Sequence, residues 1–223
     1  MAAHLDLEEQ EQLEQLKAFW KRWGNLITWV LTAVLASFAA WQGWQMYQRD
    51  QAAKAASMYD EFDRALVAQD VEKAAVAAGD LKARYGGTGY AAQAGLQVAK
   101  LQLDKGKADD ARQSLTWVAE QGAEGGPYRD IARLRLASLQ MDAKAFDESA
   151  KTLDAVKSTD FAALVADRRG DLMLLQDKRD AAKAEYQKAL AGMDKAQDYR
   201  RIIEAKLATL GVPTAFEAAG AAQ

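Results

Sequence analysis

The sequence contains no cysteine, and its single histidine, His4, lies close to the N-terminus. The absence of cysteine excludes disulfide bonds, thiolate catalysis and cysteine-ligated zinc sites. Beyond His4 no imidazole is available as a general base or metal ligand, which excludes Ser-His-Asp catalysis and the HExxH zinc motif there. We therefore expect no catalytic residue, no cofactor and no metal site in the rest of the chain.

The chain also lacks an excess of charge of one sign. Three of its 29 basic and five of its 32 acidic residues precede Trp23, which leaves 26 and 27 after it. A nucleic-acid-binding domain normally carries a basic excess or a basic stripe, and contact with anionic lipid requires a polybasic cluster. Neither pattern is present, so we expect no nucleic-acid ligand.

Motifs for nucleotide binding or acid–base chemistry are weak. The glycine-rich segment at residues 86–89 has no preceding strand and no following phosphate-binding lysine, which favours a turn between helices and argues against a small-molecule substrate. Asp167 and Asp171 lie one helical turn apart, as a catalytic carboxylate pair could. The neighbouring Arg168 and Arg169, with Lys178 nearby, favour ordinary ion pairing instead.

A run of 26 residues, 23–48, carries no charge, and its centre reads LITWVLTAVLASFAAW. At about 1.5 Å per helical residue, this run can cross a hydrocarbon core of about 30 Å. Aromatic residues gather toward both of its ends, as at the two interfaces of a bilayer. We interpret it as a retained signal anchor in the lipid bilayer.

Two alternatives remain for this run, a buried core helix and a cleaved signal peptide with small residues around Ser37-Phe38-Ala39. The acid-rich segment before it and its length argue against cleavage. The balance of basic residues on its two sides, three within residues 17–22 and two within residues 49–54, favours a cytoplasmic N-terminus only slightly.

The remainder of the chain is rich in helix-forming residues and shows no sustained period-two pattern, which predicts an all-α domain. Breaks are expected at residues 86–89, at Gly125-Gly126-Pro127, and at Gly211. Ser158-Thr159-Asp160 offers N-cap side chains. No breaker follows the apolar run, so we expect its helix to continue into residues 48–69.

An internal repeat runs through this domain. Each copy has a first position on one helix and three further positions on one face of a second helix. The copies are Phe62, Ala74, Ala78 and Leu81; Ala99, Ala111, Leu115 and Val118; Ala137, Ser149, Leu153 and Val156; and Gly170, Ala182, Tyr186 and Ala189. The copy that begins with Phe62 is fainter than the others. In the other three, the small first residue lets two helices approach closely and the larger third residue fills the space between successive pairs, which is the packing of tetratricopeptide-like helix hairpins.

We therefore predict an all-α fold: a transmembrane helix followed by a tetratricopeptide-like array of antiparallel helix pairs, a short α-solenoid. The expected organisation is a cytoplasmic segment at 1–22, the anchor at 23–48, the repeat domain at 49–212 and a flexible tail at 213–223. Residues 195–210 are expected to cap the array, because a solenoid has open ends. The cap would use four apolar side chains: Ile202, Ile203, Leu207 and Leu210.

Two surfaces are candidates for protein contacts. The first helix of each pair would line a groove, whose candidate residues are Gln93, Lys100, Asp104, Ser138, Asp142, Asp167 and Asp171. Small or hydroxyl-bearing residues on the anchor would permit close approach of another membrane helix, and these are Gly24, Thr28, Thr32 and Ser37.

The whole chain resembles the YfgM family, the ancillary subunits of the SecYEG translocon. The resemblance depends on the acid-bearing N-terminal segment, the anchor ending near Gly43-Trp44, and three stretches at residues 134–137, 151–154 and 165–171. It implies a single-pass bacterial inner-membrane protein with a cytoplasmic N-terminus and a periplasmic domain. The implied partners are the SecYEG translocon and a membrane-anchored periplasmic chaperone, and the implied role is a non-catalytic adaptor that links emerging proteins to periplasmic chaperones.

Two other functions compete with this adaptor role. A membrane-anchored scaffold of another cell-envelope assembly complex would be favoured by a long linker after Gln48, which the sequence does not show. An enzyme would require a convergent polar pocket, and the absence of cysteine and of any histidine in the domain argues against it.

Overall fold

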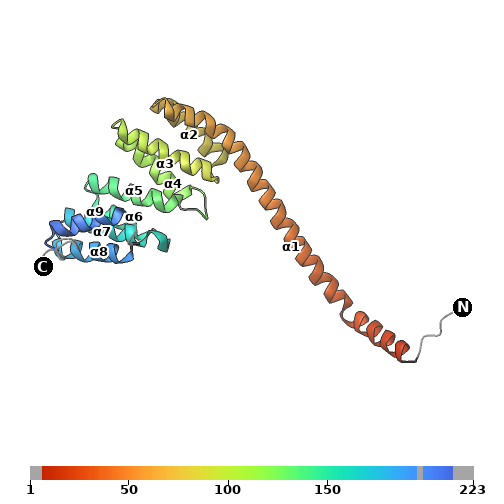
Figure 1. Ribbon diagram of the computed structural model, residues 1–223. Coiled ribbons are helices and arrows are strands. Elements are labelled where there is room, and N and C mark those ends of the chain that lie inside the picture. Colours follow the sequence, from red (N-terminus) through yellow and green to blue (C-terminus); the bar gives the residue numbers. More distant parts are fainter. Residues whose placement is uncertain (1–6, 195–197, 213–223) are drawn as a thin grey trace. The chain divides into compact units, whose positions relative to one another are not determined.

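The computed structural model describes residues 7–194 and 198–212, and every regular element in these ranges is a helix (Figure 1). The chain divides into two compact units, one ending at Asp50 and the other beginning at Gln51. The expected tail at 213–223 lies outside the described residues, as do the first three residues of the expected C-terminal cap.

Helix α1 (Leu7–Val67) contains the uncharged run, and it is the helix within the described ranges that is long and apolar enough to cross a membrane. Its large apolar side chains there are exposed, including Trp29 at 69% and Leu35 at 66%. A water-soluble surface rarely presents so many large apolar groups together. The helix also continues without interruption into the second unit, which confirms the expected run-on after residue 48.

The second unit is a stack of antiparallel helix pairs (Figure 1). The part of α1 after Asp50 pairs with α2, and the following pairs are α3 with α4, α5 with α6, and α7 with α8, before a final helix α9. Their bounds are α2 Val71–Tyr85, α3 Gly89–Asp104, α4 Ala108–Gln121, α5 Tyr128–Asp142, α6 Phe146–Asp154, α7 Ala162–Leu175, α8 Arg179–Gly192 and α9 Tyr199–Thr209. A 3₁₀ turn, η1 (Thr159–Phe161), precedes α7. The tetratricopeptide-like architecture predicted from the repeat is thus observed.

The turn within each pair has one conformation, repeated four times. Gln69, Gly106, Lys144 and Asp177 all have positive φ, between 53° and 75°. In each turn the following residue donates its N–H to a carbonyl five residues earlier, as Lys107 does to Gln102 at 2.7 Å, which closes a Schellman motif. These residues are spaced by 37, 38 and 33, the intervals of the side-chain repeat, so the backbone confirms the periodicity independently.

The repeat positions form the centre of the stack. Five of the small and large residues that face each other here are at most 1% exposed: Ala99, Leu115, Ala137, Leu153 and Tyr186. The sixth, Gly170, has no room for an added side chain because the ring of Tyr186 lies against it. Ser149 replaces the expected small apolar residue, and its hydroxyl donates to the carbonyl of Ala137 at 2.9 Å. This hydrogen bond satisfies the buried hydroxyl, so serine fits at nearly the volume of alanine.

Helix α9 closes the C-terminal end as expected, although with fewer of the predicted side chains. Ile203 and Leu207 are buried and Leu210 packs beside them, but Ile202 is 48% exposed and faces outward. Gly211 has φ of +78°, and Val212 donates to the carbonyl of Leu207, so the predicted glycine stop is a Schellman cap.

Two predicted helix starts lie close to their expected positions. Pro127 is the N-cap of α5, one residue before the first helical position. The Ser158 hydroxyl accepts the N–H of Asp160, which caps η1, and α7 follows directly.

Candidate functional site

A groove of about 410 Å³ crosses the first helices of three successive pairs, α3, α5 and α7. We call it the inner groove. It is lined by Ala99, Lys100, Leu103, Leu115, Leu134, Arg135, Ser138, Leu139, Asp142 and Arg168. Its lining is half apolar and half polar or charged, as in a surface that holds a peptide segment by apolar contact together with a few directed polar contacts.

Only some of the predicted groove residues line the inner groove. Lys100, Ser138 and Asp142 line the inner groove, and Lys100 forms an ion pair with Asp104 at 2.6 Å. Gln93 is half-buried on α3, away from the groove lining. The Ser138 hydroxyl donates to the carbonyl of Leu134 at 3.2 Å, so its oxygen remains available as an acceptor.

Asp167 and Asp171 occupy different surroundings from the other candidates. Asp167 is fully buried, so in this conformation its carboxylate cannot contact another protein. Asp171 is partly exposed, and both carboxylates belong to an ionic network under α9. The sequence pattern placed these residues on the correct helix, α7, but did not distinguish its inner-groove face from the face covered by α9.

Sequence reasoning missed the two arginines of the groove. Arg135 and Arg168 each lie two residues before the small repeat residue, Ala137 and Gly170 respectively, so the repeat register could have identified them. Arg135 is exposed and donates to the carbonyl of Leu96 at 3.3 Å, and within the described ranges it forms no ion pair. It is therefore the cation of the inner groove that is free to meet an acceptor from outside.

The network under α9 satisfies both carboxylates of α7. Asp167 accepts from Lys206 at 2.8 Å, and from Arg168 and Tyr199, each also at 2.8 Å. Asp171 accepts from Lys206 at 2.6 Å, from Tyr186 at 2.7 Å, and from Arg168 at 3.2 Å. Every carboxylate oxygen thus has a donor, and a closed network of this kind holds helices together.

The predicted ion pairing of Asp167 and Asp171 is correct for Arg168 but not for the other two cations. Arg169 pairs with Asp154 at 2.5 Å, and Lys178 donates to the side chain of Gln176 at 2.6 Å. The remaining cation comes from α9, 35 residues or more along the chain, where no local spacing could show it.

The protonation equilibria in the network favour the forms that pair. Burial lowers the pKa of Lys206, but its hydrogen bonds and charge interactions with Asp167 and Asp171 outweigh burial and raise this pKa. Burial also lowers the pKa of Arg168, but its interactions with Tyr199 and the two aspartates raise it overall. Burial, followed by hydrogen bonding to Asp171, raises the pKa of Tyr186. These groups remain cationic lysine, cationic arginine and neutral tyrosine well above neutral pH, which suits stabilisation rather than proton transfer.

The predicted packing face of the apolar run is narrower than expected. Gly24, Thr28 and Thr32 recur every fourth residue, but Ser37 lies about 140° around the helix from Thr32, at about 100° per residue. The indole of Trp20 covers Gly24, since a Cβ built there would lie 3.1 Å from the ring.

The hydroxyls of the predicted packing residues, Ser37 included, are already occupied as donors. Thr28, Thr32 and Ser37 each donate to the carbonyl four residues earlier at 2.8 Å, which lets a hydroxyl reside in an apolar medium.

Comparison with known proteins follows this architecture along almost the whole chain. Residues 17–212 match the family model of a tetratricopeptide repeat-like domain. A curated protein of Neisseria gonorrhoeae (strain ATCC 700825 / FA 1090), named ancillary SecYEG translocon subunit, is 31% identical over 219 residues, which cover 94% of this chain and all of that protein. The chain belongs to this family. An Escherichia coli (strain K12) protein of the same name is 32% identical over 99 residues, which cover 44% of this chain and 47% of that protein. The predicted family resemblance is therefore confirmed.

Proposed function

We propose that this protein is a non-catalytic accessory subunit of the SecYEG translocon. The observation that carries the proposal is the alignment with the Neisseria protein of that name, which spans the full length of that relative, the apolar run included. A relative matching only the repeats would support the fold alone, because helical repeats serve many functions. Here the anchor and the repeat domain are matched together.

The apolar run at residues 23–48 would hold the protein in the inner membrane, with the N-terminus in the cytoplasm and the repeat domain in the periplasm. The length and the exposed apolar surface of this part of α1 support the membrane assignment. The slight excess of basic residues before it supports the orientation.

Within this role, we assign the repeat domain to contacts with emerging proteins and with a periplasmic chaperone. The inner groove supplies an apolar floor through Leu103, Leu134 and Leu139, and Arg135 supplies a free cation. The two carboxylates most suggestive of catalysis, Asp167 and Asp171, are engaged with donors inside the fold. The adaptor function therefore uses surface contacts and no turnover.

Site-specific photo-crosslinking in intact membranes tests the proposal. A photoreactive residue at Thr28 or Thr32 should crosslink to a translocon subunit, whereas one at Val30, on the opposite side of the helix, should crosslink less. A probe at Ser138 should capture a chaperone or a nascent chain, and a probe at Glu120, which lines a different surface, serves as its control. Crosslinks from all sites only to other envelope proteins would contradict the translocon role and favour a scaffold of another assembly complex.

The orientation has a separate test that uses the absence of cysteine. A single cysteine at Gln176, in the turn between α7 and α8, gives one reactive thiol in the whole chain. A membrane-impermeant maleimide applied to cells with permeabilised outer membranes should label it without disruption of the inner membrane. Labelling only after the inner membrane is broken would reverse the proposed orientation.

A further inference from the structure

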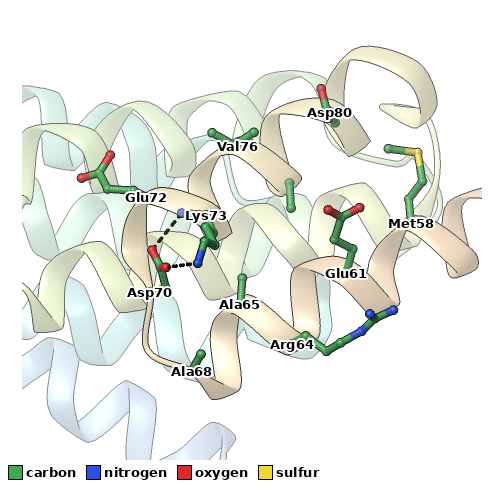
Figure 2. Close-up of a pocket in the computed structure, with 11 residues that line it drawn as sticks. Met58, Glu61, Arg64, Ala65, Ala68, Asp70, Glu72, Lys73, Val76 and Asp80 are labelled. Carbon is green, nitrogen blue, oxygen red and sulfur yellow. Dashed lines mark hydrogen bonds and ion pairs between the residues drawn. The ribbon is translucent and has the colours of Figure 1, made fainter.

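A second groove lies on the first helix pair, entirely within the unit that begins at Gln51. It has a volume of about 500 Å³, and we call it the end groove. Figure 2 shows Val76 and Asp80 on one wall, from α2, and Met58, Glu61 and Ala65 on the other wall, from α1. Small and apolar side chains form its floor. Charged groups of both signs stand at its edges, with the acidic groups in excess: Glu61, Asp70, Glu72 and Asp80 against Arg64 and Lys73.

The internal repeat shows which structure bounds such a groove on its open side. Seven residues of the end groove each have a counterpart 37 residues later in the sequence that lines another groove. This other groove lies on the α3–α4 pair and has a volume of about 340 Å³. The seven end-groove residues are Met58, Glu61, Ala65, Lys73, Val76, Ala77 and Asp80. Their counterparts, in the same order, are Gly95, Val98, Gln102, Asp110, Gln113, Ser114 and Trp117.

In the α3–α4 groove the remaining wall is a helix. All its other lining residues belong to α2: Ala75, Ala78, Gly79 and Lys82. Ala78 is 8% exposed and Ala75 packs against the same core, so α2 lies close to α3 and α4 here. The ammonium group of Lys82 lies 5.3 Å from the centre of the Trp117 ring, a cation–π contact. The end groove corresponds to this groove one repeat earlier, and no helix within the described residues forms the corresponding wall.

The end groove differs from its counterpart in a way that selects the charge of an occupant. Asp80 stands where Trp117 stands in the other groove, and Glu61 replaces Val98. Neither carboxylate forms an ion pair or a side-chain hydrogen bond in the described part of the chain. A cation on a docked helix, at the position of Lys82, would meet Asp80 and gain a direct ion pair.

We propose that the end groove binds an amphipathic helix of a partner protein. The helix would present alanine or glycine to Ala65 and Ala77, and a lysine or arginine to Asp80 and Glu61. This is helix-in-groove recognition, with apolar contacts supplying affinity and charges setting the register. Val76, which is 68% exposed, would be covered by the bound helix.

The occupant cannot be the equivalent helix of a second copy. In a folded copy, α2 already lies against α3 and α4: Ala78, which lines the α3–α4 groove, is 8% exposed, and the adjacent Ala74 and Leu81 are fully buried. A second copy would have to unfold its first pair to donate that helix. A partner with a free helix of the same chemistry has no such cost.

A peptide with the sequence of residues 71–85 is the direct probe, since this sequence forms the remaining wall of the equivalent groove one repeat further on. The peptide is acetylated, amidated and fluorescently labelled, and its binding to the purified full-length protein in detergent is followed by anisotropy. Val76→Asp should weaken binding about tenfold or more, because a charge replaces apolar contact. Val67→Asp is the matched control, because Val67 is 77% exposed and lies outside the groove lining.

A charge exchange tests the register. Asp80→Lys should weaken peptide binding about fivefold or more, and a peptide carrying Lys82→Glu should recover binding to that variant but not to the wild type. Asp60→Lys, on the exposed surface of α1 outside the groove lining, is the control for net charge. Circular dichroism of each variant verifies that the fold is retained.

Absence of peptide binding, or equal binding by Val76→Asp and Val67→Asp, would overturn the proposal. A photoreactive residue at Val76 in membranes that yields only a crosslinked dimer of this chain would assign the groove to self-association and would also overturn it. Neither result depends on the translocon, so this inference and the proposed function fail independently.

Discussion

The contact between Gly170 and Tyr186 offers a quantitative test of the packing in the repeat. A Cβ added to Gly170 would lie 2.5 Å from Cδ1 and 2.9 Å from Cζ of Tyr186. The ring cannot move aside freely, because it is fully buried and its hydroxyl donates to Asp171 at 2.7 Å. The other two clear copies of the repeat have alanine at this position, but they have leucine opposite it.

Gly170→Ala should therefore destabilise the protein even though alanine is the better helix former. The gain in helix propensity is about 1 kcal/mol. The cost of overpacking is about 1–3 kcal/mol, and strain on the Tyr186 hydrogen bond adds about 1 kcal/mol. The net loss should be about 1–3 kcal/mol. In a Tyr186→Leu background the same substitution should instead be neutral or stabilising by up to about 1 kcal/mol, because it restores the pair used in the other copies.

The measurement is urea unfolding of the full-length protein in detergent, with hydrogen exchange of α7 and α8 as the local readout. Gly79→Ala provides the control, because Gly79 is within α2 and an added Cβ would have no neighbour within 4 Å. It should stabilise by up to about 1 kcal/mol. If Gly170→Ala has the same sign with tyrosine and with leucine at position 186, the proposed steric coupling does not exist.

Three further predictions concern the cap and the turns. Lys206→Met leaves the buried Asp167 with fewer donors and should cost about 2–4 kcal/mol, measured by urea unfolding at pH 8. Burial lowers the pKa of Lys206, but its hydrogen bonds to the aspartates raise this pKa overall. The stabilisation by Lys206 is therefore complete below about pH 10.5 and is lost as pH rises through the raised pKa. The loss of stability caused by Lys206→Met should be smaller at pH 11 than at pH 8, and an unchanged loss would contradict this assignment. Lys144→Gly, at a φ of 59°, should raise the melting temperature through a gain of up to about 1–2 kcal/mol, whereas the N-cap substitution Thr88→Ala should lower it by a loss of about 1 kcal/mol.

The elements that the sequence predicted well are those with a periodic cause. The uncharged run and the recurrence of small and large residues each repeat one physical requirement several times, so a single irregularity such as Ser149 does not conceal the pattern. The helix stop at Gly211 was also predictable, because glycine is the residue best suited to positive φ.

The elements that were missed have no local signal. Three of the four turns within pairs use Gln69, Lys144 and Asp177 at positive φ, where glycine would be expected, and only their spacing reveals them. The donor from Lys206 to Asp167 joins residues 39 apart on α9 and α7. Such a pair depends on how the last helix docks, which composition and spacing along the chain do not determine.

The two ends of the array differ in a way that bears on function. At the C-terminal end, α9 buries Ile203 and Leu207 and is fixed by an ionic network around a fully buried aspartate. At the N-terminal end, the groove that is bounded by a further helix elsewhere in the stack keeps Val76 exposed, and its Glu61 and Asp80 form no ion pair within the described residues. A stack that needed only stability would close both ends alike, since open ends of repeat arrays cost solubility. The asymmetry is therefore expected of an array that is finished at one end and extended by another protein at the other.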